Sequence, residues 1–134
     1  LARPIAGRGI ATADLDGDGD PDLVLTQVGG PPLVLRNDQA TGHHWLKVRL
    51  ADPQGNRLGI GAVVELMAGG KTQRRTVTAT RGYLSQSETV ATFGLGDATG
   101  VEGISVRWPD GALQEVEASR LSVVDTTVVV ERVR

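Results

Sequence analysis

Apolar and polar residues alternate with a period of two along much of the chain. Residues 45–50 read Trp-Leu-Lys-Val-Arg-Leu, which places Leu46, Val48 and Leu50 on one side of an extended strand. Successive side chains of a strand point to opposite faces, so this pattern predicts a half-buried strand. No stretch has the apolar spacing of a helix, and we expect an all-β chain. Alternation, β-branched runs and turn residues predict strands over 9–13, 23–27, 33–36, 45–50, 62–67, 71–80, 103–108, 112–118 and 126–133.

Two turn signals join neighbouring strands. Ala68-Gly69-Gly70 separates the strands predicted over 62–67 and 71–80, and two consecutive glycines are typical of a tight hairpin. Pro109-Asp110-Gly111 predicts a second turn, because proline fixes φ and Asp-Gly accepts tight geometry. Strands joined by such short turns run antiparallel, so we expect an antiparallel β-sandwich or open barrel.

Composition narrows the classes of function. The 134 residues are enough for one domain with a real core. A formal net charge of -2 indicates no basic surface for nucleic acid or anionic lipid, and no segment is apolar enough to cross a bilayer. The absence of cysteine excludes disulfides and thiolate metal sites. The sequence opens at Leu1 without a basic and then apolar leader, and we expect any signal peptide to have been removed or to be absent from this sequence.

An aspartate stands at every second position between the strands predicted over 9–13 and 23–27. Carboxylates packed so closely repel one another unless a cation collects their oxygens. Ca²⁺ accepts many oxygen ligands in flexible geometry, and the interleaved glycines let the loop bend inward. We therefore predict a calcium site, with a solvated acidic turn as the alternative. The predicted metal ligands are Asp14, Asp16, Asp18 and Asp22 through their side chains and Asp20 through its backbone carbonyl.

The spacing of the aspartates also begins like an EF-hand, but that interpretation fails. An EF-hand needs a bidentate glutamate at position twelve, where this chain has Leu25, and Pro21 before an apolar run favours a strand over the flanking helix. The loop instead resembles the calcium loop of FG-GAP/VCBS repeats, the propeller blades of integrin α-subunits and many bacterial surface proteins. The resemblance implies an N-terminal blade-like strand, calcium loop and strand within residues 1–38. A propeller needs several blades, so a neighbouring propeller domain is also implied.

Several motifs beyond the loop resemble the ASPIC/UnbV domain, which commonly follows FG-GAP/VCBS repeats in secreted proteins. These motifs are Asn37 and the stretches 42–50, 56–64, 81–87, 93–96 and 106–111. The resemblance implies a β-domain over residues 39–134 and an extracellular or periplasmic location. No long linker separates the two parts, and we expect them to pack as one unit.

The stretch from Arg81 to Ser87 is the strongest candidate for an exposed recognition loop, because it combines an aromatic ring with clustered hydrogen-bonding groups. Packing is the alternative for its aromatic residue and for both tryptophans, Trp45 and Trp108. His43 and His44 face opposite sides of a strand, so both cannot easily reach one ion. The candidate ligand-binding residues are Trp45, Arg81, Tyr83, Ser85 and Gln86.

Three functions fit these features. The first is a non-catalytic, extracellular calcium-binding recognition or adhesion module, with a glycan or an extracellular protein as partner. The second is a structural C-terminal cap of a β-propeller with no ligand of its own. The third is a polysaccharide-acting enzyme, which is disfavoured because the densest carboxylates are committed to calcium. Ser85, His44 and Asp97 can be combined on paper into a triad, but no nucleophile motif supports it, and we expect no catalysis.

Overall fold

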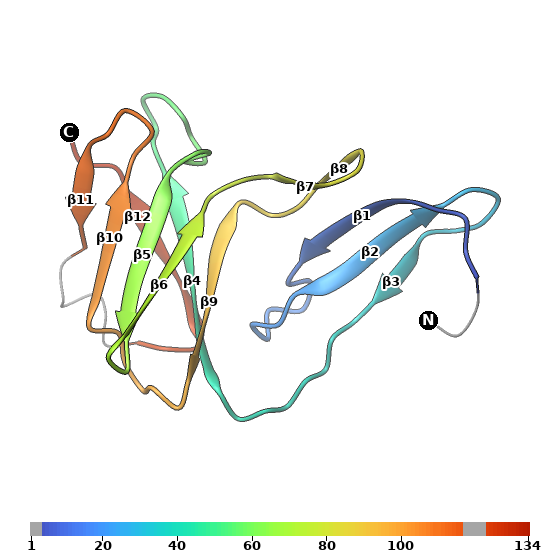
Figure 1. Cartoon of the computed structure of the whole chain (residues 1–134), viewed down its shortest axis with the longest axis horizontal. Coiled ribbons are helices and arrows are strands. Elements are labelled where there is room, and N and C mark those ends of the chain that lie inside the picture. The colour runs from blue at the N-terminus through green and yellow to red at the C-terminus, as the bar shows by residue number, and fades with distance from the viewer. Residues whose placement is uncertain (1–3, 117–122) are drawn as a thin grey trace. The chain divides into compact units, whose positions relative to one another are not determined.

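Residues 4–116 and 123–134 are described by the computed structural model shown in Figure 1. All regular structure in these residues is β, and they contain no helix, which confirms the expected fold class. No helix of these residues could therefore serve as a membrane span. The chain forms two compact units. Leu1–Ala40 and Ala79–Glu88 make up the first, and Thr41–Thr78 and Thr89–Arg134 make up the second.

The first unit is built on a three-stranded antiparallel sheet in the order β1-β2-β3. These strands match those predicted over 9–13, 23–27 and 33–36. A short hairpin of two further strands belongs to the same unit, although it falls within the 39–134 part of the sequence. The strands are β1 (Gly7–Ala13), β2 (Asp22–Gln27), β3 (Leu33–Leu35), β7 (Thr80–Gly82) and β8 (Ser85–Gln86).

The second unit is a sandwich of two sheets, with strand orders β11-β10-β5-β6 and β12-β4-β9. The expected sandwich is therefore present, and among the described strands neither sheet closes into a barrel. The strands are β4 (His44–Ala51), β5 (Val63–Ala68), β6 (Lys71–Thr76), β9 (Val90–Gly96), β10 (Gly103–Arg107), β11 (Leu113–Glu115) and β12 (Thr126–Glu131).

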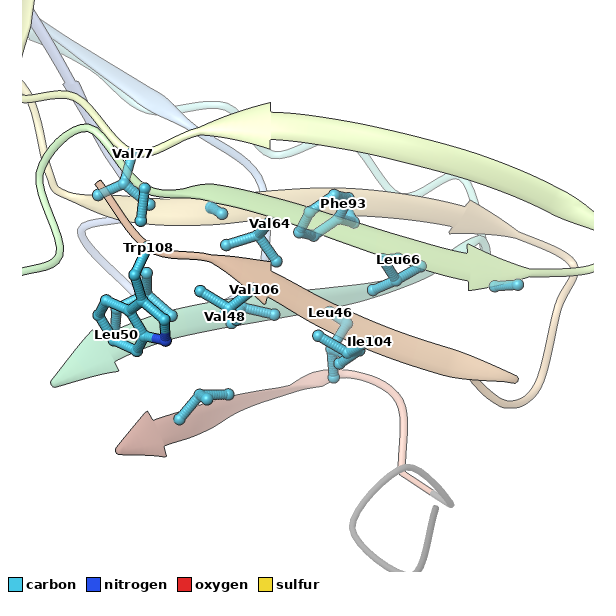
Figure 2. Close-up of a cluster of buried hydrophobic side chains, with 14 of the residues drawn as sticks. Leu46, Val48, Leu50, Val64, Leu66, Val77, Phe93, Ile104, Val106 and Trp108 are labelled. Carbon is cyan, nitrogen blue, oxygen red and sulfur yellow. The ribbon is translucent and has the colours of Figure 1, made fainter. Parts of the chain in front are cut away.

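Alternating side chains from both sheets form the core of the second unit (Figure 2). In β5, Val64 and Leu66 are fully buried, whereas Met67 is 42% exposed. Trp108 is also buried, which confirms its predicted packing role. The cluster consists of Leu46, Val48, Leu50, Ala62, Val64, Leu66, Ala68, Val77, Ala91, Phe93, Leu95, Ile104, Val106, Trp108 and Val130.

Both predicted turns are present. Gly69 and Gly70 join β5 to β6 with φ values of 56° and 69°, which favour glycine because a Cβ is strained there. In the second turn the Gly111 amide donates to the Trp108 carbonyl at 2.9 Å, and β11 returns along β10. Pro109 therefore occupies the second position of the turn, where its fixed φ is favourable.

Two strand predictions need correction, and three strands were missed. The strand expected over 71–80 ends at Thr76, and Thr80 instead begins β7 in the first unit. The strand expected over 112–118 is Leu113–Glu115, and residues 117 and 118 lie outside the described residues. The strands β7, β8 and β9 were not predicted from the sequence. Gly94 lies within β9, and a glycine weakens the sequence pattern of a strand because it has no side chain to pack.

The C-terminal strand departs from the antiparallel expectation, because β12 pairs with β4 in parallel, with Val128 opposite Val48. Tight turns force neighbouring strands to run antiparallel, whereas strands distant in sequence can pair in either direction. The second sheet is therefore mixed.

Candidate metal centre

The predicted calcium loop joins two adjacent strands of the first unit. β1 ends at Ala13 and β2 begins at Asp22, and these two residues are paired in the sheet. Between them, Gly17 and Gly19 have φ values of 83° and 101°. Left-handed backbone at these two positions suits glycine and lets the chain reverse within a few residues.

Local hydrogen bonds shape the loop. The carboxylate of Asp14 accepts from the amides of Gly17 at 2.7 Å and Gly19 at 3.0 Å. Asp18 accepts from the amide of Asp20 at 2.9 Å. Short acidic side chains often bond to nearby backbone amides in this way, and the bonds hold the loop curved without consuming every lone pair of the carboxylates.

Three of the five predicted metal ligands come together. Asp14, Asp16 and Asp18 each offer a carboxylate oxygen, and these oxygens lie within 4.8 Å of one another. Oxygens bound to one Ca²⁺ at about 2.3–2.6 Å can be up to about 5 Å apart across the ion. The donor set is therefore of the right chemistry and spacing for calcium, and these residues fit the ion.

Asp22 has a different environment from the other four aspartates. Only 1% of it is exposed, and its two oxygens accept from the amides of Leu15 and Asn37, both at 2.8 Å. It therefore ties the start of the loop to the segment after β3. Asp20 and Asp22 are not among the three clustered carboxylates. Each Asp22 oxygen keeps a second lone pair, so its backbone bonds are compatible with a metal contact.

Arg36 lies beside the acidic loop and balances part of its negative charge. The Nε of Arg36 lies 3.6 Å from Asp16 and 2.5 Å from Asp38. The pKa of Arg36 is raised, first by its hydrogen bond to Asp38 and then by the nearby negative charge, so the guanidinium stays charged. Arg36 is shared between Asp16 and Asp38, so it offsets only part of the charge of the five aspartates in the loop.

The candidate recognition residues Arg81, Ser85 and Gln86 lie on the β7–β8 hairpin, and Tyr83 lies at its tip. Tyr83 is 70% exposed and does not cover a core. Ser85 donates its hydroxyl to the Tyr83 carbonyl at 2.9 Å. The neighbouring Leu84 is 84% exposed with a φ of 49°, unusual for leucine, and was not singled out from the sequence.

Trp45 belongs to the second unit, whereas the hairpin belongs to the first. It lies in β4, partly buried, and the ammonium of Lys47 sits 5.4 Å from its ring centre. Such a cation–π contact indicates a packing role on the strand. A recognition role for Trp45 stays a prediction.

The two histidines each face a different carboxylate. His44 Nδ1 lies 2.7 Å from Asp125, whereas His43 Nε2 lies 3.8 Å from Asp97. His44 is therefore paired with Asp125, and not with the Asp97 of the triad considered from the sequence. His43 precedes β4, which begins at His44, so the sequence expectation that both histidines lie on a strand holds only for His44.

The comparisons with known proteins assign both parts of the chain. The family described as ASPIC and UnbV matches residues 52–132, and the FG-GAP repeat matches residues 6–42. Cartilage acidic protein 1 of Mus musculus is 35% identical over 112 residues, covering 80% of this chain and 17% of that protein. The Homo sapiens protein is also 35% identical over 112 residues, and the Xenopus tropicalis protein is 34% identical over 110 residues.

This chain therefore spans less than a fifth of the length of these relatives. The FG-GAP match contains the acidic loop, and the ASPIC and UnbV match contains the later motifs from residue 56 onward, whereas Asn37 and the motif over 42–50 precede that match. The chain belongs to the ASPIC and UnbV family and carries one FG-GAP repeat ahead of that domain.

Proposed function

We propose that this chain is a non-catalytic, calcium-stabilised recognition or adhesion module of an extracellular protein. The observation that carries the proposal is the cluster of Asp14, Asp16 and Asp18 oxygens within 4.8 Å, in a loop closed by the buried Asp22. The FG-GAP match over this loop supports the choice of calcium. The relatives are named for cartilage, and an extracellular location is proposed for this chain from that likeness.

Calcium is expected to stabilise the first unit by binding only its folded loop. Calcium at about 2 mM and a Kd of about 10⁻⁴ M, within the range of extracellular modules, would contribute about 1.8 kcal/mol. Thermal melts in calcium and in excess chelator measure this stabilisation. Asp16→Ala removes one clustered carboxylate and should lower the melting temperature only in calcium.

Asp97→Ala is the matched control, because the side chain of Asp97 is 98% exposed and lies outside the loop. It should keep the full calcium shift. The calcium site is wrong if the wild type melts at the same temperature in calcium and in chelator. It is also wrong if Asp16→Ala causes equal losses in both conditions.

The recognition surface is proposed to be the β7–β8 hairpin, with a glycan as the first ligand class to test and an extracellular protein as the second. Its exposed tyrosine offers a stacking face, and Arg81 and Gln86 are both exposed hydrogen-bonding side chains. Because these groups are exposed, their removal should weaken binding without lowering the melting temperature.

A glycan array probed with the calcium-loaded protein tests this surface. Arg81→Ala should weaken a bound glycan about tenfold if Arg81 is an interface anchor, and Arg107→Ala, an exposed arginine on β10, should leave binding unchanged. Equal losses from both variants would contradict recognition by the hairpin. The appearance of new reducing ends on a bound polysaccharide would contradict the non-catalytic assignment.

A structural cap is the second candidate, and one observation favours it. In the described part of the first unit, no hydrophobic side chain is fully buried. A sheet without its own core needs a neighbouring sheet to cover a face, and a preceding propeller blade would supply one. A calcium shift with no binding to any glycan or extracellular protein would favour the cap.

A further inference from the structure

The strand before the acidic loop has a second bonded edge. Backbone groups of adjacent residues in a strand point to opposite edges. Thr12 uses its edge to meet the segment after β8: its amide donates to the Ser87 hydroxyl at 3.1 Å, and its carbonyl accepts from the Glu88 amide at 3.3 Å. The hairpin segment therefore holds the backbone of Thr12 from the side opposite to β2.

The hairpin lies unusually close to β1, and two glycines allow it. A Cβ on Gly82 would stand 2.8 Å from the carbonyl oxygen of Ile10. A Cβ on Gly9 would stand 2.6 Å from the Ser85 hydroxyl oxygen. Both distances are too short for real Cβ contacts. At Gly82 the close atom is backbone, so the contact requires glycine there, whereas at Gly9 the Ser85 hydroxyl would have to move.

Thr12 is also close to the acidic loop along the chain. Asp14, which contributes to the clustered carboxylates, follows two residues later, and Ala13 between them pairs with the buried Asp22. Movement of the Thr12 backbone therefore changes where the loop begins. Conversely, mutual repulsion among carboxylates without a cation loosens the end of β1 that the hairpin contacts.

We propose that Ser87 and the Glu88 amide are positioning groups for the calcium loop, so that calcium binding and docking of the β7–β8 hairpin strengthen each other. This inference rests on the proposed calcium site. Coupling between two binding events is reciprocal, so hairpin docking raises calcium affinity by the same factor by which calcium favours docking. The exposed tip at Tyr83 and Leu84 is then presented in a fixed position only when calcium is bound.

The first test measures hydrogen exchange of the wild-type chain in calcium and in chelator. Calcium should slow exchange at the Thr12 amide and at the hairpin amides from 80 to 88. Strands of the second unit, such as β10, serve as the internal reference and should not change. Unchanged exchange at Thr12 and the hairpin, in a protein that binds calcium by titration calorimetry, overturns the coupling and leaves the calcium site intact.

The second test removes the hydroxyl that accepts from Thr12. Ser87→Ala should weaken calcium binding up to about fivefold, the equivalent of one hydrogen bond of about 1 kcal/mol. Ser87→Thr keeps a hydroxyl and should restore most of the affinity. Ser105→Ala is the matched control, because Ser105 is a partly buried serine on β10 in the second unit.

A purely structural role for Ser87 predicts a different pattern, in which Ser87→Ala lowers the melting temperature in chelator but leaves the Kd for calcium unchanged. That result overturns the coupling. If the wild type itself binds no calcium, the proposed site and the coupling both fail. If Ser87→Ala does not fold, the exchange measurement on the wild type decides the question alone.

Discussion

Two carboxylates of the second unit carry lowered pKa values because of specific neighbours. The pKa of Asp110 is lowered first by its hydrogen bond from Arg132 and then by the amide of Ala112. The pKa of Asp125 is lowered first by its hydrogen bond with His44 and then by the amide of Trp45, which donates to it at 3.0 Å. The pair of Asp110 with Arg132 and the pair of Asp125 with His44 each join residues that are distant in sequence.

A carboxyl group whose pKa is lowered by folding stabilises the folded state when the pH is above the group's ordinary pKa, which is 3.8 here. That stabilisation is lost as the pH falls through the folded-state pKa. In chelator, the melting temperature should therefore decrease when the pH drops below about 3.8. The double variant Asp110→Asn, Asp125→Asn should melt lower than the wild type near neutral pH and approach it in acid. Calorimetry across this pH range measures the difference.

Asp97→Asn serves as the control, since it replaces an exposed carboxylate and should follow the wild-type curve. Parallel curves for the wild type and the double variant would contradict a stabilising role for the two ionised carboxylates.

At the scale of the element, burial follows the two-residue period most clearly along β5 and β10, where buried and less buried residues alternate. On β5, Leu66 points into the sandwich with no exposed surface, and Met67 points out. Neighbouring positions on one strand therefore differ sharply in what they contribute to stability.

Leu66→Ala should lower the free energy of unfolding by about 2–5 kcal/mol, because it removes buried methyl groups and leaves a cavity. Met67→Ala, the matched control on the outward face, should change it by less than about 1 kcal/mol. Urea unfolding followed by fluorescence of the tryptophans measures both. Similar losses for the two variants would contradict the inward and outward assignment of β5.

At the scale of the whole molecule, the two units differ in how they are held together. Every residue of the buried apolar cluster belongs to the second unit. In the described part of the first unit, the buried residues are Gly19 and Asp22, so its order depends on hydrogen bonds of the sheet, the loop and the hairpin and not on an apolar core. The proposed cation, hairpin docking and covering sheet would each supply the first unit with stabilisation that a buried apolar cluster supplies to the second.

Much of the fold could be predicted from the sequence because its signals are local. The alternation in β4 and β10, the glycines of the β5–β6 turn and the aspartate spacing of the loop each act within a few residues. The family motifs also predicted that the chain has two parts, an FG-GAP repeat followed by an ASPIC/UnbV domain. The clustered positions of Asp14, Asp16 and Asp18 follow from the same short-range geometry.

Only the tertiary structure decided which distant segments meet. β12 pairs in parallel with β4, and Thr12 is hydrogen-bonded to Ser87 and Glu88, although these residues are far apart in sequence. Thr80 belongs to β7 in the first unit and not to the preceding strand β6. Likewise, the backbone amide of Asn37 donates a hydrogen bond to the buried carboxylate of Asp22, fifteen residues earlier in the chain. The sequence by itself determined strands, turns and the acidic loop, because these depend on neighbouring residues. Which distant strands pair depends on the free energy of the whole packed chain, and no local pattern encodes that choice.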